Sequence, residues 1–395
     1  MQFAPNEMQM WVKTPRSRRP QLSDQEINEK YNSKAERIVT EMNREKLQNF
    51  YDALKRPGYM DTRPFYQRRQ RWDASRQSKL IESLLINIPI PPLFVYEVKP
   101  NVYEVMDGQQ RISAIRAFYS NELKLEGLER WPELNGKIYS KLPERIRAGI
   151  DRRSISWITL LNESAETDEE AMELKQLTFE RLNTGGVELS AQEVRNSLYH
   201  GPFNDLLHKL TRMPQFRSAW GLPLFDEIEL KTTPVELLDH SFYKKMDDIE
   251  LVLRFFALRH ADHYQKGMKG FLDLYMLRAR AFTAEDLQIL EQLFSRTLNM
   301  AAQVYGDKLF KPFNPKTGEW AKTPQRAYAD AVLVAYSRFL DKEEQLIAKR
   351  DNISEMTKTL FADDVDGVLT GRGNTKKDVQ DRITTVQGLI SNALG

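Results

Sequence analysis

The sequence predicts an α+β protein in two parts: an N-terminal domain with a small mixed sheet among helices, and an all-helical C-terminal domain. Strand-like segments occur only in the first part, at residues 93–98, 102–106 and 154–161. Beyond residue 230, amphipathic helical patterns cover residues 234–262, 268–281, 284–305 and 325–347. The length of 395 residues also favours two domains. We therefore predict a basic flexible arm at residues 1–22, a mixed domain at 23–225 and a helical domain at 226–395.

Composition excludes several classes of protein. Lys and Arg number 58 against 56 Asp and Glu, a net charge of +2, so any attraction to phosphate must be local. The chain has no cysteine, which excludes a disulfide framework, a thiolate zinc site and a cysteine nucleophile. No uncharged apolar stretch approaches membrane-spanning length. We expect a cytoplasmic protein with no membrane partner.

Helix-capping and helix-breaking residues predict the first secondary-structure elements of the chain. Three prolines and four basic residues within the first twenty residues predict the flexible arm. Ser23 and Glu26 form a capping box that opens a helix. Helical pattern resumes over residues 34–54 and ends at Pro57-Gly58.

The middle of the domain alternates between helix and strand. Ser75 opens a helix with an apolar face, which the prolines at 89, 91 and 92 end. Two strands follow, at residues 93–98 and 102–106, and the second leads directly into Asp107-Gly108. A further helix begins near Gln110.

The remaining elements of this domain surround a second glycine motif. A strand at residues 154–161 precedes an acidic loop and a helix that runs through Arg181. The segment Asn183-Thr184-Gly185-Gly186 can cap that helix because glycine tolerates positive φ. Ser190 and Glu193 form a second capping box.

The turn at residues 107–111 is the strongest chemical feature of the sequence. A strand ends, a glycine permits a tight turn and a helix starts, so unpaired N–H groups at the helix N-terminus favour an anion. Gly108 allows a phosphate to approach the backbone, Arg111 can bind phosphate oxygens, and Asp107 can hold hydrated Mg²⁺ or a ribose hydroxyl. The alternative is an ordinary Asp-Gly turn with a polar helix cap.

The segment Val105 to Ile112 (VMDGQQRI) resembles the N-terminal domain of GmrSD-type restriction endonucleases, a ParB/sulfiredoxin-like family with a D-G-Q-Q-R motif. Three further segments agree in order and spacing: residues 66–72 (YQRRQRW), residues 80–92 (LIESLLINIPIPP), and residues 179–186 (FERLNTGG) with Ser190, Glu193, Arg195 and Asn196. The resemblance covers roughly residues 60–210 and implies a ParB/sulfiredoxin-like fold.

The resemblance also implies a nucleoside triphosphate with Mg²⁺ at this turn. Asp107, Gln109, Gln110 and Arg111 would be the catalytic residues, and Asp107 would hold the metal. The nucleotide-binding residues would be Arg68, Gly108, Arg111, Arg181, Asn183, Thr184, Gly185 and Gly186. The residues alone do not identify a general base, for which Gln109, Gln110 and Asp107 are all candidates.

The sequence departs from full-length restriction endonucleases of this type. None of its five histidines belongs to a His-Asn-His nuclease site, and no P-loop motif is present. The pair His260 and His263 could bind a metal at i, i+3, but a solvated helix end is the more ordinary interpretation. DNA cleavage would therefore need a separate nuclease or effector subunit.

Two basic segments are candidates for DNA binding. The first contains Arg63, Arg69 and Arg71 with aromatic residues between them, and the second contains Arg372, Lys376 and Lys377. The alternatives are ion pairs within the domain for the first segment and a basic surface turn for the second.

These observations lead to one principal hypothesis, an NTP-binding and NTP-hydrolysing component of a DNA-restriction or anti-phage system. Its expected partners are DNA, including modified phage DNA, and a separate nuclease; a homo-oligomer stays open. The alternatives are a DNA-binding or adaptor protein with a nucleotide switch but no turnover, and a ParB-like nuclease.

Overall fold

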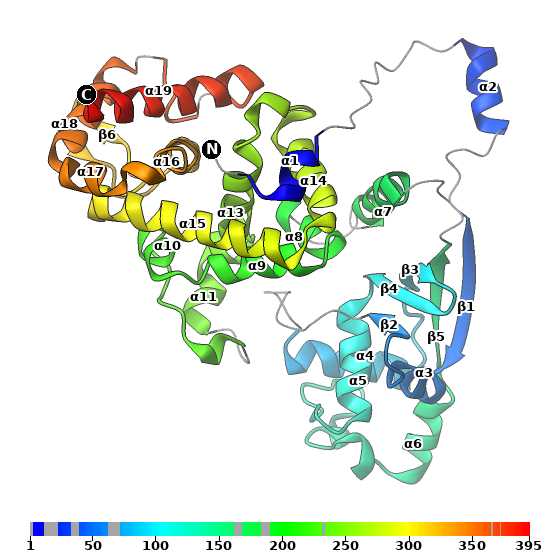
Figure 1. Ribbon diagram of the computed structural model, residues 1–395. Helices are drawn as coiled ribbons and strands as arrows, with labels where there is room; N and C mark the ends of the chain where they lie inside the picture. Colours follow the sequence, from blue (N-terminus) through cyan, green and yellow to red (C-terminus); the bar gives the residue numbers. More distant parts are fainter. Residues whose placement is uncertain are drawn as a thin grey trace. The chain divides into compact units, whose positions relative to one another are not determined.

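The chain forms two compact units, which are shown in Figure 1. The computed structural model describes residues 3–11, 23–32, 39–61, 72–161, 168–182, 190–230, 234–364, 366–371 and 373–395. The first unit, here called the sheet unit, spans Arg18–Glu188. The second, the helical unit, combines Met1–Ser17 with Leu189–Gly395. The predicted α+β class is confirmed.

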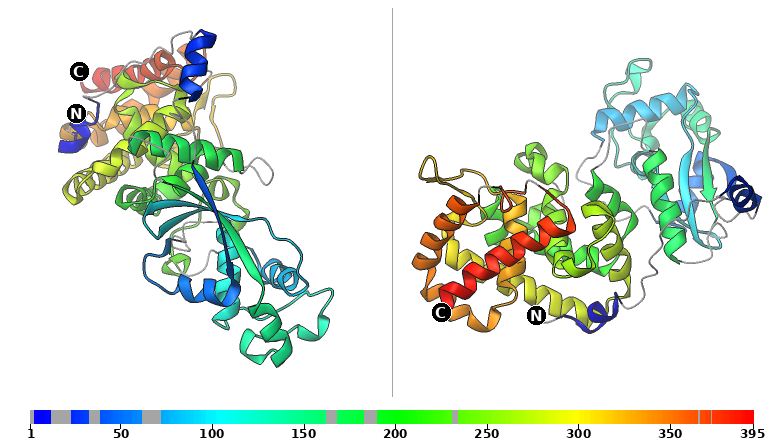
Figure 2. Two further views of the ribbon diagram at one scale, coloured as in Figure 1. Left: turned by 90° about the vertical axis from the view of Figure 1, so that its right-hand side faces the viewer. Right: turned by 90° about the horizontal axis from the view of Figure 1, so that it is seen from above.

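The sheet unit is built on a mixed five-stranded sheet in the order β1-β5-β3-β4-β2. β1 (Thr40–Lys46) is antiparallel to β5 (Ser154–Leu160), which runs parallel to β3 (Leu93–Lys99). β3 forms an antiparallel hairpin with β4 (Val102–Asp107), and β2 (Met60–Asp61) pairs in parallel with β4. Figure 2 shows this sheet as a twisted layer, with its long first strand in blue. The twist follows from the chirality of the strands.

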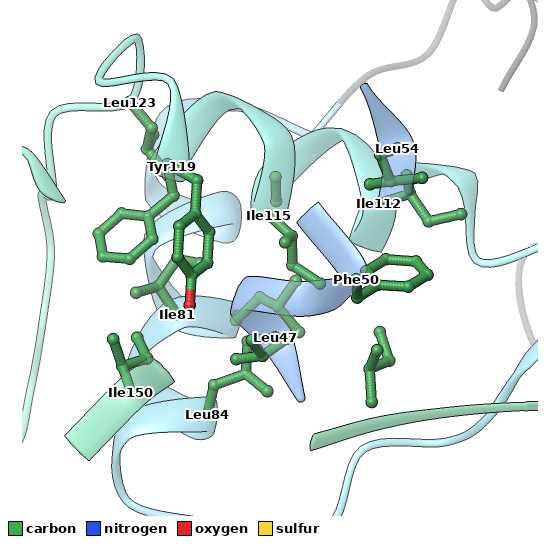
Figure 3. Close-up of a cluster of buried hydrophobic side chains, with 14 of the residues drawn as sticks. Leu47, Phe50, Leu54, Ile81, Leu84, Ile112, Ile115, Tyr119, Leu123 and Ile150 are labelled. Atoms are coloured by element: carbon green, nitrogen blue, oxygen red, sulfur yellow. The ribbon is translucent and has the colours of Figure 1, made fainter. Parts of the chain in front are cut away.

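One face of the sheet packs on a continuous hydrophobic core. The helices that cover it are α3 (Leu47–Leu54), α4 (Ala74–Leu85), α5 (Gln109–Tyr119) and α6 (Glu144–Asp151). Figure 3 shows the centre of this core, where Phe50, Ile81, Ile112 and Ile115 lie together. The core fixes α5 against β4 and therefore fixes the turn between them.

The other face of the sheet carries helix α7 (Asp168–Leu182). Because side chains alternate along a strand, Glu104 lies on the face opposite to that of the core residue Val105. Lys175 of α7 forms a salt bridge with Glu104, and its ammonium group lies 4.6 Å from the centre of the Tyr96 ring. Helix α7 is thus attached to the strand that leads into the turn.

Two predicted boundaries in this unit need correction. The helical pattern over residues 34–54 is wrong for residues 40–46, which form β1 and pair with β5 along their whole length. Hydrogen bonding to β5 overrides the helix propensity of Glu41, Arg44 and Glu45. Helix α4 begins one residue before Ser75, because Asp73 caps it by accepting a hydrogen bond from the Arg76 backbone N–H at 2.7 Å. The Ser23–Glu26 capping box of α2 (Asp24–Asn32) is confirmed.

The helical unit contains one helix that precedes the sheet unit in the sequence and a series of helices that follow it. They are α1 (Pro5–Gln9), α8 (Ala191–Leu198), α9 (Pro202–Leu210), α10 (Pro214–Ala219), α11 (Val235–Asp239), α12 (Ser241–Lys244), α13 (Asp247–Leu258), α14 (Gly267–Arg278), α15 (Ala284–Tyr305), α16 (Arg326–Tyr336), α17 (Glu343–Ala348), α18 (Arg350–Asp363) and α19 (Lys376–Leu394). A short hairpin, β6 (Phe313–Asn314) with β7 (Glu319–Trp320), interrupts them, so this region is not purely helical.

The division between the units lies before the predicted boundary at residue 225. Helices α8, α9 and α10 pack against α13, α14 and α15, which places residues 189–225 in the helical unit. The amphipathic face of α9 explains this, since Phe203, Leu206 and Leu207 are buried there.

The N-terminal segment also differs from the predicted flexible arm. Residues 3–11 contain helix α1, and the side chain of Glu7 is fully buried in the helical unit. The Glu7 carboxylate accepts hydrogen bonds from Arg259 at 2.9 Å and from the Tyr275 hydroxyl at 2.9 Å, and it contacts His260 Nε2 at 3.0 Å. A buried carboxylate requires such partners, which single-sequence patterns do not reveal. The rest of the predicted arm lies outside the described residues.

Within the described residues, no helix combines the length and apolar character needed to cross a membrane.

Candidate functional site

The turn at residues 107–111 has the strand–glycine–helix geometry that the sequence predicts. Asp107 ends β4, Gly108 follows with φ of 96°, and α5 begins at Gln109. The two residues before Asp107, Val105 and Met106, are buried and hold the strand end in place. A Cβ at position 108 would lie 2.2 Å from Leu93 Cδ2, so the position requires glycine for space as well as for conformation.

The N-terminus of α5 favours an anionic ligand. Gly108 is the N-cap residue and has no side chain to cap the helix; its carbonyl accepts the first helical hydrogen bond, from Ile112 N–H at 2.9 Å. A helix N-terminus carries a partial positive charge and directs N–H groups along its axis. This arrangement suits a phosphate group.

Asp107 and Arg111 form an ion pair across the turn. Arg111 Nη2 lies 2.6 Å from Asp107 Oδ2, and the side chains are 11% and 40% exposed, respectively. Arg111 Nη1 also donates to the carbonyl oxygens of Pro91 and Pro92. Arg111 therefore connects the turn to the proline segment that enters β3. Its predicted contact with phosphate stays a prediction.

Gln110 connects the turn to the arginine-rich segment. Its Oε1 accepts a hydrogen bond from the Trp72 backbone N–H at 3.2 Å, and Gln77 Nε2 donates to the Trp72 carbonyl oxygen at 2.9 Å. Trp72 is the last residue of the YQRRQRW segment, so this segment ends beside the turn. The other predicted residues of the segment, Arg63, Arg68, Arg69 and Arg71, lie outside the described residues.

The R-L-N-T-G-G segment is only partly described. Arg181 lies in the last turn of α7 with an exposed side chain, and α7 is attached to β4 through Lys175 and Glu104. Asn183, Thr184, Gly185 and Gly186 lie outside the described residues. Their predicted role in nucleotide binding stays a prediction.

The final part of the resemblance, residues 190–196, belongs to the helical unit and has a structural role there. Arg195 is 1% exposed and forms ion pairs with Asp273 at 2.7 Å and Glu250 at 2.9 Å. Asn196 Oδ1 accepts a hydrogen bond from Asn204 Nδ2 at 2.9 Å and lies 2.7 Å from His208 Nε2. These contacts anchor α8 among its neighbours.

The second predicted DNA-binding segment lies at the start of α19. Lys376 donates to the backbone carbonyl of Asp262, while the side chain of Lys377 is exposed. The preceding turn is held by buried Arg382, which donates to the Gly373 carbonyl oxygen. Arg372 lies outside the described residues. DNA binding by this segment stays a prediction.

The two histidines at residues 260 and 263 differ, because His260 is buried while His263 is exposed. His260 is 6% exposed and contacts Glu7, and burial lowers its pKa below the ordinary value of 6.5. His263 stacks on Trp11 with ring centres 5.1 Å apart. No group of three or more His, Asp or Glu residues suited to a metal ion occurs in the part of the chain that the structure describes.

The turn still has chemistry that fits Mg²⁺. Asp107 supplies a partly exposed carboxylate, and Gln109, two positions later, carries an amide oxygen. Mg²⁺ prefers oxygen ligands and commonly uses one or two carboxylates with water and substrate phosphates. Asp107 would therefore hold the ion together with a bound phosphate.

Several important contacts of the sheet unit have no local signal in the sequence. The Glu82 carboxylate accepts three backbone N–H groups, from Glu129, Arg130 and Trp131. The Asp151 carboxylate accepts the hydroxyl groups of Tyr119 and Tyr139 at 3.0 Å. Each partner is more than ten residues away in the sequence, which is why cap and periodicity patterns miss them.

Comparison with known proteins gives one result. Residues 47–200 match the family model described as the GmrSD restriction endonuclease N-terminal domain. The match covers α3 to α8, four of the five strands and the turn at residues 107–111, and it extends over well under half of the chain. No curated protein and no solved structure shows a significant match to the chain.

Proposed function

We propose, from the match of residues 47–200 to the GmrSD restriction endonuclease N-terminal domain, that the chain is a component of a restriction system and that the turn at Asp107–Arg111 binds a nucleoside triphosphate with Mg²⁺. The observation that carries the proposal is the glycine N-cap of α5, which leaves the helix N-terminus without a side-chain cap beside an exposed carboxylate and an arginine. These groups can bind a phosphate and its metal ion together.

The ion pair between Asp107 and Arg111 suggests how the site responds to its ligand. Asp107 would hold Mg²⁺ through its carboxylate, and its pairing with Arg111 would then weaken, because both cations compete for the same oxygens. Arg111 would then turn its guanidinium group toward the phosphate oxygens. The Asp107 side chain is partly exposed and that of Arg111 lies just below the surface, so this exchange needs a change of rotamer in which Arg111 Nη1 also leaves the Pro91 and Pro92 carbonyls, and no refolding.

In this proposal the other predicted residues complete the nucleotide site. Gln109 would orient the attacking water, and the helix N-terminus and Arg111 would stabilise charge on the transferred phosphoryl group. Gln110 would support the site by holding Trp72, since its side-chain oxygen already contacts that backbone. Arg68 and the segment from Arg181 to Gly186 would supply further phosphate contacts. DNA and a separate nuclease would be the partners of the NTP-bound form.

A thermal-shift panel of ATP, CTP, GTP and UTP, each with and without Mg²⁺, tests the proposal. A ligand at 100 times its dissociation constant stabilises the folded state by about 2.7 kcal/mol, which is readily measured. We expect one or more nucleotides to raise the melting temperature only with Mg²⁺. Phosphate release with the same nucleotide then distinguishes turnover from a switch without hydrolysis.

Asp107→Asn is the decisive variant, and Asp52→Asn is its matched control. Asp52 also forms an ion pair with a cation in the sheet unit, Lys55 at 2.7 Å, but lies on α3 away from the turn. Asp107→Asn should remove the Mg²⁺-dependent stabilisation, and Asp52→Asn should retain it. Wild-type nucleotide binding by Asp107→Asn, or no stabilisation of the wild type by any nucleotide, would refute the proposal.

A further inference from the structure

A polar hollow of about 250 Å³ lies in the sheet unit beside the loop that follows α4. Its polar lining comes from Arg44 on β1, Asn87 in the loop, and Arg153, Ser154 and Ser156 at the start of β5. Among the described residues that line this hollow, none is acidic. A concave surface with two guanidinium groups and several neutral donors is suited to an anion.

The pairing of β1 with β5 places a cation and a hydroxyl group side by side. Arg44 is the register partner of Ser156, so the two side chains project from the same face of the sheet. The neighbouring acid, Glu45, projects to the opposite face, where its Oε1 accepts a hydrogen bond from Asn49 Nδ2 at 2.9 Å. The charge of Arg44 at this hollow is therefore not neutralised by the adjacent residue.

Arg153 is fixed in position but incompletely hydrogen-bonded. Its carbonyl oxygen accepts the Leu47 N–H at 2.8 Å, and its Nη2 donates to the Leu85 carbonyl oxygen at 3.0 Å. Its Nε is buried and has no hydrogen-bond partner in the described part of the chain. Arg153 as a whole is half-buried, and a guanidinium group that is partly removed from water favours an anionic partner, because an unpaired charge is costly to remove from water.

We infer that this hollow is a phosphate-binding site, distinct from the turn at residues 107–111. Its volume is below the roughly 300–1,000 Å³ of pockets that enclose a whole small ligand, so it suits one phosphate group. Arg44 and Arg153 would bind the phosphate oxygens, with Ser154, Ser156 and Asn87 as neutral donors. The phosphate belongs to a DNA backbone or to a small free anion, and the chemistry of recognition is the same for both.

The site lies close in the chain to the proposed nucleotide site but does not depend on it. Pro89 and Ile90 line the hollow, and the next residues, Pro91 and Pro92, accept hydrogen bonds from Arg111. Residues 89–90 therefore line the hollow, and residues 91–92 contact the turn. A second phosphate site here would remain if the turn bound no nucleotide.

The test measures binding of two probes to the full chain: inorganic phosphate by calorimetry, and a short DNA duplex by fluorescence anisotropy. Arg44→Gln removes one exposed cation, and Ser156→Asp places a negative charge in the hollow without removing a structural contact. Arg116→Gln, which changes another exposed arginine, on α5, is the control for net charge. We expect Arg44→Gln to weaken binding roughly tenfold, as for loss of one charge-assisted hydrogen bond, and Ser156→Asp to abolish it.

The probes distinguish the sources of the phosphate. If only DNA binding weakens, the ligand is a backbone phosphate, and Arg44→Gln should reduce the slope of log K against log salt by about 0.9. If phosphate binding also weakens, the site accepts free anions. Arg44→Gln and Ser156→Asp should have the same effects in an Asp107→Asn background, which separates this site from the nucleotide proposal. The inference is wrong if the wild type binds neither probe, or if both hollow variants melt normally and bind like the Arg116→Gln control.

Discussion

The core of the helical unit and the turn of the sheet unit hold their charged residues in different ways. In the helical unit, arginine side chains are buried with their carboxylate partners: Arg195 with Glu250 and Asp273, and Arg217 with Glu229 at 2.9 Å. At the turn of the sheet unit, Asp107 is 40% exposed, and its partner Arg111 lies just below the surface. Buried pairs maintain structure, since separating them leaves an unpaired charge, whereas a half-exposed pair can exchange partners at low cost.

Removing a buried arginine should cause the largest loss of stability and is therefore the most stringent test of this difference in burial. Arg195→Leu should destabilise the helical unit by about 3–5 kcal/mol, because Glu250 and Asp273 lose a partner while largely buried. Lys209→Ala, which removes an exposed pair with Glu291, should cost less than about 1 kcal/mol. Differential scanning calorimetry measures both. Equal losses in the two variants would show that burial does not distinguish these pairs.

Gly108→Ala should produce the next largest effect. The new methyl group would meet Leu93 and would be held at positive φ, so we expect a loss of about 1–3 kcal/mol from the sheet unit. Gly149→Ala is the control, because its Cβ would have no neighbour within 4 Å and lies in helix α6; it should stabilise by about 0.5–1 kcal/mol. Thermal melts of the two variants should therefore shift in opposite directions. An unchanged melting temperature for Gly108→Ala would mean that the turn accommodates the methyl group without loss of stability.

Acid should weaken the helical unit gradually. Burial would raise the pKa of Glu7, but the hydrogen bond from His260 and the charge of Arg259 outweigh it, so the pKa lies below its ordinary value of 4.5. Burial lowers the pKa of His260 below 6.5. In both cases the unfolded chain binds protons first as pH falls. The stability contributed by His260 is therefore lost as pH falls below about 6.5, and that contributed by Glu7 as pH falls below about 4.5.

Calorimetric melts across this range check the expectation. His260→Gln should reduce the dependence of the melting temperature on pH near the ordinary histidine pKa. The dependence at lower pH, which Glu7 causes, should remain. Glu26→Gln, which changes an exposed cap residue of α2, should leave the whole profile of the helical unit in place. A melting temperature that rises on acidification would contradict this account of Glu7 and His260.

The smallest expected effect is that of Asp107→Asn on stability. The Asp107 side chain is substantially exposed, so loss of its pair with Arg111 should cost less than about 1 kcal/mol. The same substitution should have a large effect on Mg²⁺-dependent nucleotide binding. A loss of stability comparable with that of Arg195→Leu would assign a structural role to the turn and remove the distinction between the two units.

Local patterns in the sequence predicted the turn and most of the elements around it. Glycine at position 108, the apolar face of α5 and the Ser190–Glu193 capping box each act over a few residues, and each forms as expected. The family match over residues 47–200 confirms the resemblance that these segments carry. The roles of Asp107, Gln109, Gln110 and Arg111 in catalysis stay predictions.

Features that depend on distant partners were not predictable. β1 has the composition of a helix and becomes a strand because β5, more than a hundred residues later, pairs with it. The hollow at Arg44 and Arg153 depends on the same pairing. The burial of Glu7 depends on Arg259 and Tyr275. A single sequence does not record such contacts, since no local residue implies them.

The docking of helix α1 has a consequence for the order in which the chain acquires its structure. Glu7 and Arg259 are separated by 252 positions, and the whole sheet unit is synthesised between them. Contacts of such long separation form late, because a long loop must close first. We therefore expect the sheet unit to fold on the ribosome before α1 docks. The segment that is synthesised first would then be among the last to reach its native position.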